Sequence, residues 1–194
     1  MTDHHDLTPS PWIARFAHLI PPGARVLDLA AGQGRHARFL AARGAEVVAV
    51  DRDADALAAL ATVPGITVRV CDLEGGAWPL AGERFDAIVV ANYLHRPLFP
   101  HLRAALASDG VLLYETFAMG NEAYGRPTRP EFLLCRDELL TIAALPPAPL
   151  TVVAFEQGEI DHGVRRAVVQ RLAAVGPDRV GPPLLAASGA SLER

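Results

Sequence analysis

Residues 25–40, RVLDLAAGQGRHARFL, decide the fold of this chain. The stretch opens with an apolar run interrupted by Asp28, passes through Gly32 and Gly34, and ends with the apolar spacing of a helix. This order predicts a strand, a tight loop and a helix. Two glycines let a ligand approach the backbone, at a helix end whose unpaired N–H groups and dipole favour a carboxylate or phosphate. We interpret the stretch as a cofactor site.

Composition limits the class of protein. The chain has 194 residues, of which 51% are hydrophobic and 21% charged, as expected for one ordinary globular domain. The formal net charge of −4 offers no general attraction to anionic membranes or phosphate backbones, which argues against nucleic acid as a partner. The sequence has no secretory signature, no run of the roughly 18 apolar residues of a membrane helix, and no metal-ligand spacing. We therefore expect a cytoplasmic protein without a metal, and the sequence carries no signal of its oligomeric state.

Strand-like and helix-like segments alternate as far as residue 117. Apolar runs predict strands at residues 25–30, 46–51, 66–71, 85–91 and 111–117. Helices are predicted at residues 10–20, 34–43, 53–60 and 97–106, with a turn at Asp109-Gly110 before the fifth strand. Strands separated by helices pair in parallel and carry helices on both faces of the sheet. The sequence thus predicts a three-layer α/β fold, Rossmann-like and doubly wound, with a mostly parallel sheet.

The alternation ends after Phe117. Residues 118–133 form a long predicted loop rich in Gly, Pro and Arg, and a helix is expected at residues 136–144. Two further strands are expected at residues 150–156 and 166–172, joined by residues 158–163. An antiparallel hairpin of these two strands would close the sheet.

The end of the chain differs from the rest in composition. From Gly176 it contains Pro, Gly, Ser and small residues without periodicity. Such a segment has too little apolar surface to bury. We therefore expect a single domain over residues 1–175 and a poorly ordered tail over residues 176–194.

Polar side chains follow the predicted strands at the edge where a ligand is expected. In an open parallel sheet, ligands bind outside the C-terminal ends of the strands. The residues at these ends are Asp28 to Gly34, Asp51 and Arg52, Asp72 and Leu73, Asn92 to His95, and Glu115 to Phe117. Asp51 lies 17 residues after Gly34, close to the spacing of about 20 for an acid that accepts two ribose hydroxyls. Asp51 is therefore predicted to bind a ribose.

Two cofactor classes compete for this edge. A nicotinamide dinucleotide needs a loop that admits a pyrophosphate, and its first strand normally has no acid just before the glycines. Asp28 stands at that place here, where it suits a cationic ligand or anchors the loop by accepting its backbone N–H groups. Asp72 adds an acceptor for an adenine amino group. With Asp51, these acids fit a sulfonium cofactor better than a dinucleotide.

Over about residues 10–172 the chain resembles the class I S-adenosylmethionine-dependent methyltransferases. The resemblance rests on VLDLAAGQG at residues 26–34, VDRD at 50–53, CDL at 71–73 and FDAIVVAN at 85–92. The chain looks most similar to small bacterial members of the tellurite-resistance methyltransferase type. The resemblance implies a seven-stranded sheet whose last strand is antiparallel. Ala30 departs from the family's acid-x-Gly-x-Gly-x-Gly pattern, because it stands where the first glycine belongs.

The resemblance also implies a cofactor, S-adenosylmethionine, and a role for each matching residue. Asp28 would hold the loop, while Ala30, Gly32 and Gly34 would frame the methionine part of the cofactor. Asp51 would bind the ribose hydroxyls, Arg52 would pack beside the adenine, and Asp72 with Leu73 would hold the adenine. Ala91 and Asn92 would pass close to the sulfonium. The implied reaction is an in-line displacement that moves the methyl group to a small-molecule acceptor and leaves S-adenosylhomocysteine. Positioning alone supplies roughly 7–11 kcal/mol in favourable cases, so no covalent residue is required.

The candidates for acid–base chemistry lie beyond the cofactor residues. The residues able to act as a general base are Tyr93, His95, Tyr124 and His162. A working pKa near neutrality favours a histidine, and His95 lies just after the fourth predicted strand. His95 equally suits the solvent-facing start of a helix.

The acceptor side has candidates in the long loop. Tyr124, Arg126 and Arg129 suit an acidic or aromatic acceptor, since arginine binds carboxylates through paired hydrogen bonds. The alternative is a proline-stiffened surface connection with solvated arginines. Trp12 is expected either in the core or over the cofactor, and Arg165, Arg166 and Arg171 are expected to form a solvated face.

Two other functions are weighed against methyl transfer. One is a nicotinamide-dependent Rossmann oxidoreductase, which Asp28 and the terminal hairpin disfavour. The other is a non-catalytic regulatory protein that binds S-adenosylmethionine. Because the sequence has no additional binding domain and a net negative charge, we expect a metabolite as the acceptor.

Overall fold

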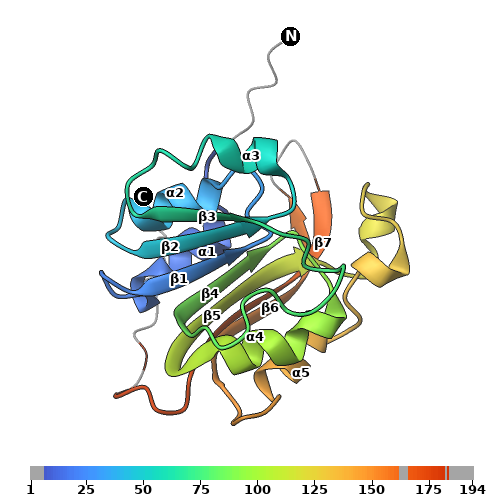
Figure 1. The fold of residues 1–194 in the computed structure, drawn as a ribbon. Helices are drawn as coiled ribbons and strands as arrows, with labels where there is room; N and C mark the ends of the chain where they lie inside the picture. Colours follow the sequence, from blue (N-terminus) through green and yellow to red (C-terminus); the bar gives the residue numbers. More distant parts are fainter. Residues whose placement is uncertain (1–6, 162–165, 182, 184–194) are drawn as a thin grey trace, which may run out of the picture.

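The computed structural model describes residues 7–161, 166–181 and 183. Within them, seven strands form one sheet in the order β3-β2-β1-β4-β5-β7-β6 (Figure 1). The strands are β1 (Arg25–Leu29), β2 (Glu46–Asp51), β3 (Ile66–Val70), β4 (Phe85–Ala91), β5 (Leu106–Phe117), β6 (Thr151–Asp161) and β7 (Arg166–Val175). Strands β1 to β5 pair in parallel, whereas β7 runs antiparallel to both β5 and β6. The predicted mostly parallel sheet with an antiparallel C-terminal hairpin is confirmed.

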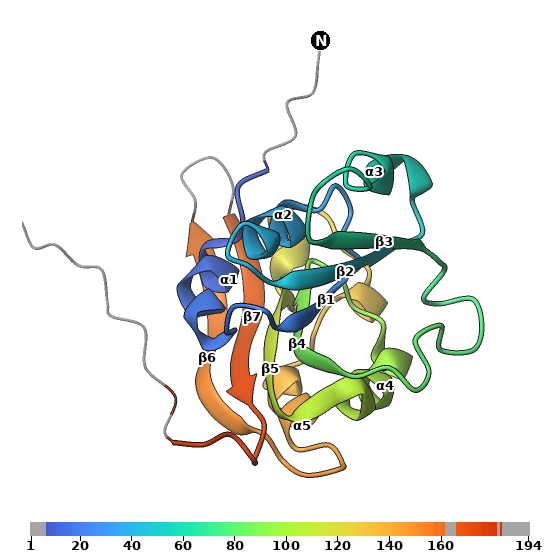
Figure 2. The ribbon, with the colours of Figure 1, turned by 60° about the vertical axis from the view of Figure 1, so that its left-hand side comes forward.

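Helices cover both faces of the sheet. Those in the described residues are α1 (Pro11–Phe16), α2 (Arg35–Ala41), α3 (Ala54–Ala58), α4 (Phe99–Ala105) and α5 (Glu138–Ala143). One buried cluster joins a face of the sheet to α4 and α5, and a second joins the other face to α1, α2 and α3. Neighbouring residues of β1 alternate between the two, with Val26 in the second cluster and Leu27 in the first. Figure 2 shows α1 and α2 on one side of the sheet and α4 and α5 on the other.

The first helix begins where the sequence predicts it but changes form before its predicted end. The Ser10 side chain accepts a hydrogen bond from the Trp12 N–H at 3.1 Å, and Pro11 occupies the first helical position. The α-helix ends at Phe16 and continues as one 3₁₀ turn, η1 (Ala17–Leu19). Trp12 is 2% exposed and lies in the core, as one of its two interpretations expected.

The predicted turn at Asp109-Gly110 is wrong, because β5 already begins at Leu106. Its ladder with β4 is irregular between Leu106 and Val111, where extra residues bulge out. The Gly110 carbonyl accepts a hydrogen bond from the Gly176 N–H at 2.7 Å. Local residue preferences predicted a turn at these positions. Instead, hydrogen bonds to residues distant in the chain hold this backbone within the strand.

The C-terminal hairpin is longer than predicted. Strand β6 continues to Asp161, so the predicted connection over residues 158–163 is wrong for its first four positions. Those positions pair with β7, for example Gly158 with Val169. The antiparallel ladder supplies hydrogen-bond partners that the glycine and acidic residues of this segment did not predict.

Some predictions concern residues that the structure does not describe. His162, Arg165 and residues 184–194 of the expected tail lie outside the described residues. The single domain over residues 1–175 stays a prediction. Within the described part of the chain, no helix is long and apolar enough to cross a membrane.

Candidate functional site

Three cavities open at the carboxyl ends of the central strands. The central cavity, of about 410 Å³, is lined by residues that include Ala30, Asp51, Arg52, Asp72, Leu73, Asn92, Tyr93 and Phe117. The loop cavity, of about 320 Å³, is lined by residues that include Ala30, Gly32, Arg35, Ala91 and Asn92. The side cavity, of about 500 Å³, is lined by residues that include Ser10, Arg35, Asn92, Glu115, Phe117 and Arg171. Because Asn92 lines all three cavities, they meet at the end of β4.

The loop after β1 has a left-handed backbone at three alternate positions. The φ angles are +56° at Ala30, +53° at Gly32 and +73° at Gly34. A side chain at Gly34 would bring its Cβ to 2.3 Å from Leu60 Cδ1, so this position requires glycine. Ala30 adopts the same conformation although it carries a Cβ, at a cost of roughly 1–2 kcal/mol. The loop therefore keeps a glycine-type shape where the chain has an alanine.

Asp51 ties the end of β2 to this loop. One carboxylate oxygen, Oδ2, accepts a hydrogen bond from the Gly32 N–H at 2.7 Å. The other, Oδ1, accepts one from the Asp53 N–H at 3.0 Å. The carboxylate thus lies in the wall of the central cavity, held by the backbone on both sides.

Asp28 lies buried at the end of β1. It is 1% exposed, and its Oδ2 atom has no hydrogen-bond partner among the described residues. Burial raises the pKa of Asp28 from 3.8 to about 7, although the backbone of Ala37 and the charge of Arg35 act in the opposite direction. The site therefore contains a buried carboxyl group with spare accepting capacity and a pKa close to neutrality.

The third acid, Asp72, follows β3. Its Oδ1 atom accepts a hydrogen bond from the Glu74 N–H at 2.9 Å, which fixes the turn after the strand. Leu73, 7% exposed, adds an apolar surface to the same cavity, and Arg52 lies exposed at its wall. The structure thus brings the predicted adenosine-binding residues together in the central cavity.

Tyr93 lies between the central cavity and Glu74. Its hydroxyl donates a hydrogen bond to Glu74 Oε1 at 3.2 Å. Burial, together with the neighbouring Glu74 carboxylate, raises the pKa of Tyr93 above that of an ordinary phenol. At neutral pH this side chain is therefore a hydrogen-bond donor and not a base.

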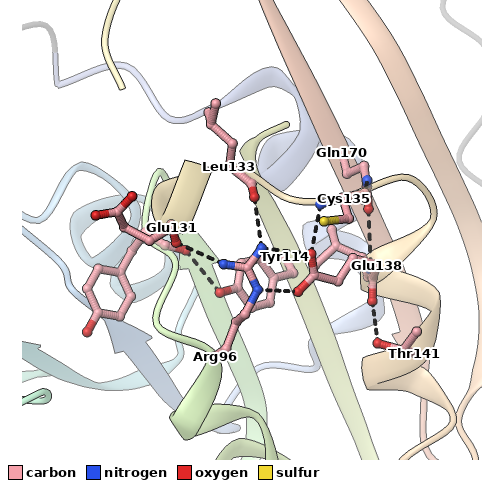
Figure 3. Close-up of polar contacts among 10 residues, drawn as sticks. Arg96, Tyr114, Glu131, Leu133, Cys135, Glu138, Thr141 and Gln170 are labelled. Carbon is pink, nitrogen blue, oxygen red and sulfur yellow. Dashed lines mark hydrogen bonds and ion pairs between the residues drawn. The ribbon is translucent and has the colours of Figure 1, made fainter. Parts of the chain in front are cut away.

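Arg96, just after β4, clamps the segment that follows β5 (Figure 3). Its Nε and Nη2 atoms donate to the two carboxylate oxygens of Glu138 at 2.6 and 2.9 Å. The same guanidinium donates to the carbonyls of Glu131 at 2.9 Å and Leu133 at 2.8 Å. Although burial acts to raise it, hydrogen bonds from Arg96 and Cys135 hold the pKa of Glu138 below its ordinary value.

The clamp positions residues that the sequence analysis missed. Pro127 and Phe132 belong to the predicted loop over residues 118–133, and both line the central cavity. Phe132 is in the 3₁₀ turn η4 (Pro130–Phe132), directly before the clamped Leu133. In the sequence, the one signal for a role of Phe132 in lining the cavity was its aromatic side chain within a polar, proline-rich loop.

The loop residues predicted to bind the acceptor lie elsewhere. The Tyr124 hydroxyl donates to Glu159 Oε2 at 2.6 Å, on the hairpin. Arg129 pairs with Glu131 and lies 5.4 Å from the centre of the Phe132 ring. None of Tyr124, Arg126 and Arg129 is among the described residues that line the three cavities.

His95 also lies away from the cavities. It precedes the 3₁₀ turn η2 (Arg96–Leu98), and its carbonyl accepts a hydrogen bond from the Leu98 N–H at 3.0 Å. Among the described residues it is not part of the lining of the three cavities. Its position agrees with the start of a helical turn.

The side cavity contains a buried polar network that joins four distant segments. The Ser10 hydroxyl donates to Glu115 Oε1 at 2.6 Å, and Arg171 Nε pairs with Glu115 Oε2 at 2.5 Å. The Ser10 N–H donates to His36 Nε2 at 3.2 Å. Burial lowers the pKa of His36 to about 3, and the nearby Arg35 charge adds to this effect, so the ring is neutral.

The prediction that Arg171 lies on a solvated face is wrong. It is 9% exposed and paired with Glu115, which is 6% exposed. The basic composition of β7 suggested a solvated strand, but an acid on the neighbouring β5 draws this side chain inward. The two residues face each other in the ladder, which spacing along the chain did not reveal.

Comparisons with known proteins agree with this geometry. A family model described as a methyltransferase domain matches residues 26–110, which include the loop after β1 and the ends of β2 to β4. Residues 26–110 are thus similar to a methyltransferase domain. It is 36% identical over 122 residues to protein-L-isoaspartate O-methyltransferase of Methylorubrum populi, covering 60% of this chain and 57% of that protein. The chain thus spans just over half the length of this curated relative.

Solved structures show the same methyltransferase fold. TehB from Haemophilus influenzae superimposes with a TM-score of 0.69 at 18% identity, over 84% of this chain and 61% of that one. The 1,6-didemethyltoxoflavin-N1-methyltransferase of Burkholderia thailandensis superimposes with a TM-score of 0.64 at 24% identity, over 87% and 78%. The latter structure contains 1,6-didemethyltoxoflavin and S-adenosylhomocysteine.

Proposed function

We propose that this chain binds S-adenosylmethionine and transfers its methyl group to a small-molecule acceptor, releasing S-adenosylhomocysteine. One observation carries the proposal. Asp28, Asp51 and Asp72 lie at or just after the carboxyl ends of three adjacent parallel strands, and Asp51 and Asp72 line the central cavity, which shares Ala30 and Asn92 with the loop cavity. In this proposal Asp28 supports the loop under a cationic ligand, Asp51 accepts the ribose hydroxyls and Asp72 accepts the adenine amino group.

The residues present fit this cofactor. The central cavity offers Asp51, Asp72 and Leu73 to the adenosine part, with Arg52 beside the adenine. The loop cavity offers Gly32 and the left-handed backbone around it to the methionine part. Ala91 and Asn92 line the loop cavity, and the Oδ2 atom of Asp28, which has no hydrogen-bond partner among the described residues, offers an acceptor at the end of β1.

The chain's own contribution to the reaction is positioning. When bound, the cofactor supplies a methyl group on a positively charged sulfur. The loop and Asp51 fix one reactant, and Asn92 with Phe117 separates the central cavity from the side cavity where the second reactant would lie. Correct placement of two reactants lowers a barrier by roughly 7–11 kcal/mol in favourable cases. No residue of the chain needs to form a covalent intermediate.

A peptide acceptor is the second candidate. The curated relative is named for O-methylation of L-isoaspartate in proteins, whereas the toxoflavin enzyme is named for a small molecule. We favour a small molecule because the side cavity of about 500 Å³ has the size of a small-ligand site. The cytoplasmic location stays a prediction.

Calorimetric titration tests the cofactor. We expect S-adenosylmethionine and S-adenosylhomocysteine to bind, and NADH to give no heat. Asp51→Ala should weaken S-adenosylhomocysteine binding by about 100-fold, because it removes a charged acceptor, while Asp55→Ala, an exposed acid of α3, should bind normally. NADH binding, or an unaffected Asp51→Ala variant, contradicts the assignment.

Label transfer tests the reaction. The protein is incubated with S-adenosylmethionine labelled in its methyl group, and either a metabolite extract or a peptide that contains L-isoaspartate. Label in the metabolite pool supports the proposal, and label in the peptide alone supports the second candidate. Cofactor binding without transfer to either pool identifies a regulatory protein.

A further inference from the structure

The side cavity adjoins both parts of the proposed cofactor site. It shares Asn92 and Phe117 with the central cavity, and Asn92 and Arg35 with the loop cavity. Its walls are otherwise largely apolar, with Ile160 and Val169 from the hairpin. A small molecule in this cavity is therefore adjacent to both parts of the cofactor site.

The charged groups of this cavity favour an anion. Arg35 and Arg171 both line it, whereas Glu115 is the one acid among its described lining residues. Both oxygens of Glu115 are engaged, by Ser10 and by Arg171. The Arg35 side chain forms no hydrogen bond or ion pair with another described residue, although its charge acts on the buried Asp28. Beside the neutral amide of Asn92, the hydrogen-bonding capacity left for a ligand is thus that of guanidinium donors.

The charged residues next to the cavity lining do not cancel the positive charge of Arg35 and Arg171. Glu156 pairs with Arg171 at 3.4 Å and with Arg15 at 3.0 Å, so it is shared between two cations. The buried Asp28, with its pKa near 7, is only partly ionised at neutral pH. The sulfonium of a bound cofactor would add one further positive charge at the junction of the cavities.

The acid–base groups near this cavity are already occupied. The Glu115 carboxylate accepts a hydrogen bond from the Ser10 hydroxyl and is ion-paired with Arg171. The neutral ring of His36 accepts from the Ser10 backbone through Nε2. An acceptor that arrives already ionised needs no proton to be removed.

We infer that the acceptor is a small carboxylic acid, bound as its carboxylate by Arg35 in the side cavity and methylated on a carboxylate oxygen. The inference rests on the proposed function. A lone pair of that oxygen forms a bond to the methyl carbon as the carbon–sulfur bond breaks, and the electron pair of the broken bond stays on sulfur. The anion and the sulfonium become a neutral methyl ester and S-adenosylhomocysteine, and no proton changes place.

The test uses the chemistry of the product. The full chain is incubated with methyl-labelled S-adenosylmethionine and the fraction of a metabolite extract retained by an anion exchanger, and the product is treated with alkali. A methyl ester releases the label as volatile methanol. Arg35→Met should lower this release by about 10- to 100-fold, because a charged hydrogen-bond donor is lost. The matched variant Arg43→Met, an exposed arginine just after α2, should react normally.

Binding measurements show whether Arg35 serves the acceptor or the cofactor. S-adenosylhomocysteine and 5′-methylthioadenosine, which lacks the methionine carboxylate, are titrated into both proteins. We expect Arg35→Met to bind S-adenosylhomocysteine within about twofold of the parent chain. Weaker S-adenosylhomocysteine binding with unchanged 5′-methylthioadenosine binding assigns Arg35 to the cofactor and overturns the inference.

The remaining outcomes separate this inference from the proposed function. Alkali-stable label overturns the inference while methyl transfer stands. S-adenosylhomocysteine binding without any label transfer overturns the inference together with the proposed methyl transfer, and identifies a regulatory protein. Failure to bind S-adenosylhomocysteine overturns the proposed function itself.

Discussion

The two halves of the site are built by different means. On the β1–β3 side, the polar contacts are short in sequence: Gly32 to Asp51 spans 19 positions, and Glu74 to Asp72 spans two. On the β4–β7 side, Arg96 reaches Glu138 across 42 positions and Ser10 reaches Glu115 across 105. The first half is assembled by single strand–loop units, whereas the second exists only when distant segments pack together.

The difference concerns both stability and function. When a carboxylate that accepts hydrogen bonds from nearby backbone N–H groups is replaced, no buried charge is left without a partner. A buried ion pair between distant strands leaves an uncompensated charge when one partner is removed. Changes to the second half should therefore affect folding most, and changes to the first half should mainly affect ligand binding.

The largest effect is expected from Arg171→Met. It leaves the buried Glu115 carboxylate without its cation, which should lower the free energy of unfolding by about 3–5 kcal/mol. Urea unfolding measures this loss. The double variant Arg171→Met with Glu115→Gln should recover most of it, and Arg136→Met, whose side chain is 87% exposed, should have no effect. Equal losses in the single and double variants would show that packing and not charge is responsible.

A pH-dependent effect is expected from Asp28. Because burial raises its pKa from 3.8 to about 7, the folded protein holds this proton more tightly, and the resulting stability is lost as the pH rises toward 7. Relative to Asp28→Asn, the parent chain should lose about 2 kcal/mol between about pH 5 and pH 7. Parallel unfolding curves of the two proteins at several pH values check this. A constant difference across the range means that Asp28 ionises normally.

A smaller effect is expected from the clamp. Arg96→Met removes the hydrogen bonds to Glu138 and to two loop carbonyls, so residues 118–135 should lose hydrogen-exchange protection. S-adenosylhomocysteine binding should weaken by about tenfold, since Phe132 is no longer held at the central cavity. Arg96→Lys keeps the charge without the paired geometry and should lie in between. Unchanged protection in Arg96→Met would mean that packing alone holds this segment.

The smallest effect is expected from Ala30→Gly, in the locally built half. Relief of the left-handed strain is partly offset by the greater freedom of glycine in the unfolded chain, so the free energy of unfolding should rise by at most about 1 kcal/mol. Gly32→Ala is the matched opposite: its Cβ would meet nothing within 4 Å, yet its φ of +53° should cost about 1 kcal/mol. Thermal unfolding of both variants measures the two signs. A destabilised Ala30→Gly would show that the alanine methyl group contributes packing that outweighs its strain.

The sequence predicted most of the first half because its determinants are local. The strand, glycine loop and helix at residues 25–40, and an acid at each of the next two strand ends, follow from residue patterns within one βα unit at a time. The parallel order of a sheet then brings those ends to one edge. The central cavity accordingly contains Asp51, Asp72 and Leu73 together.

The second half was less predictable because its determinants are contacts across the chain. The basic composition of β7 predicted a solvated Arg171, and the long loop offered Tyr124, Arg126 and Arg129 either to the acceptor or as part of a solvated surface connection. In the structure Arg171 meets Glu115 across the β5–β7 ladder, and Tyr124 meets Glu159 on the hairpin. Which charges neutralise one another depends on strand register, and no spacing along the chain determines that register.

The sequence by itself determined the fold class, the glycine loop with its preceding acid, and the polar residues at the strand ends. These follow from periodicity and from the conformational freedom of individual residues, which act over a few positions. Only the tertiary structure decided that β5 begins at Leu106, that Arg96 clamps the following segment, and that Glu115 and Arg171 pair inside the side cavity. Burial and pairing depend on neighbours brought from far along the chain, so those features arise only once the sheet has closed.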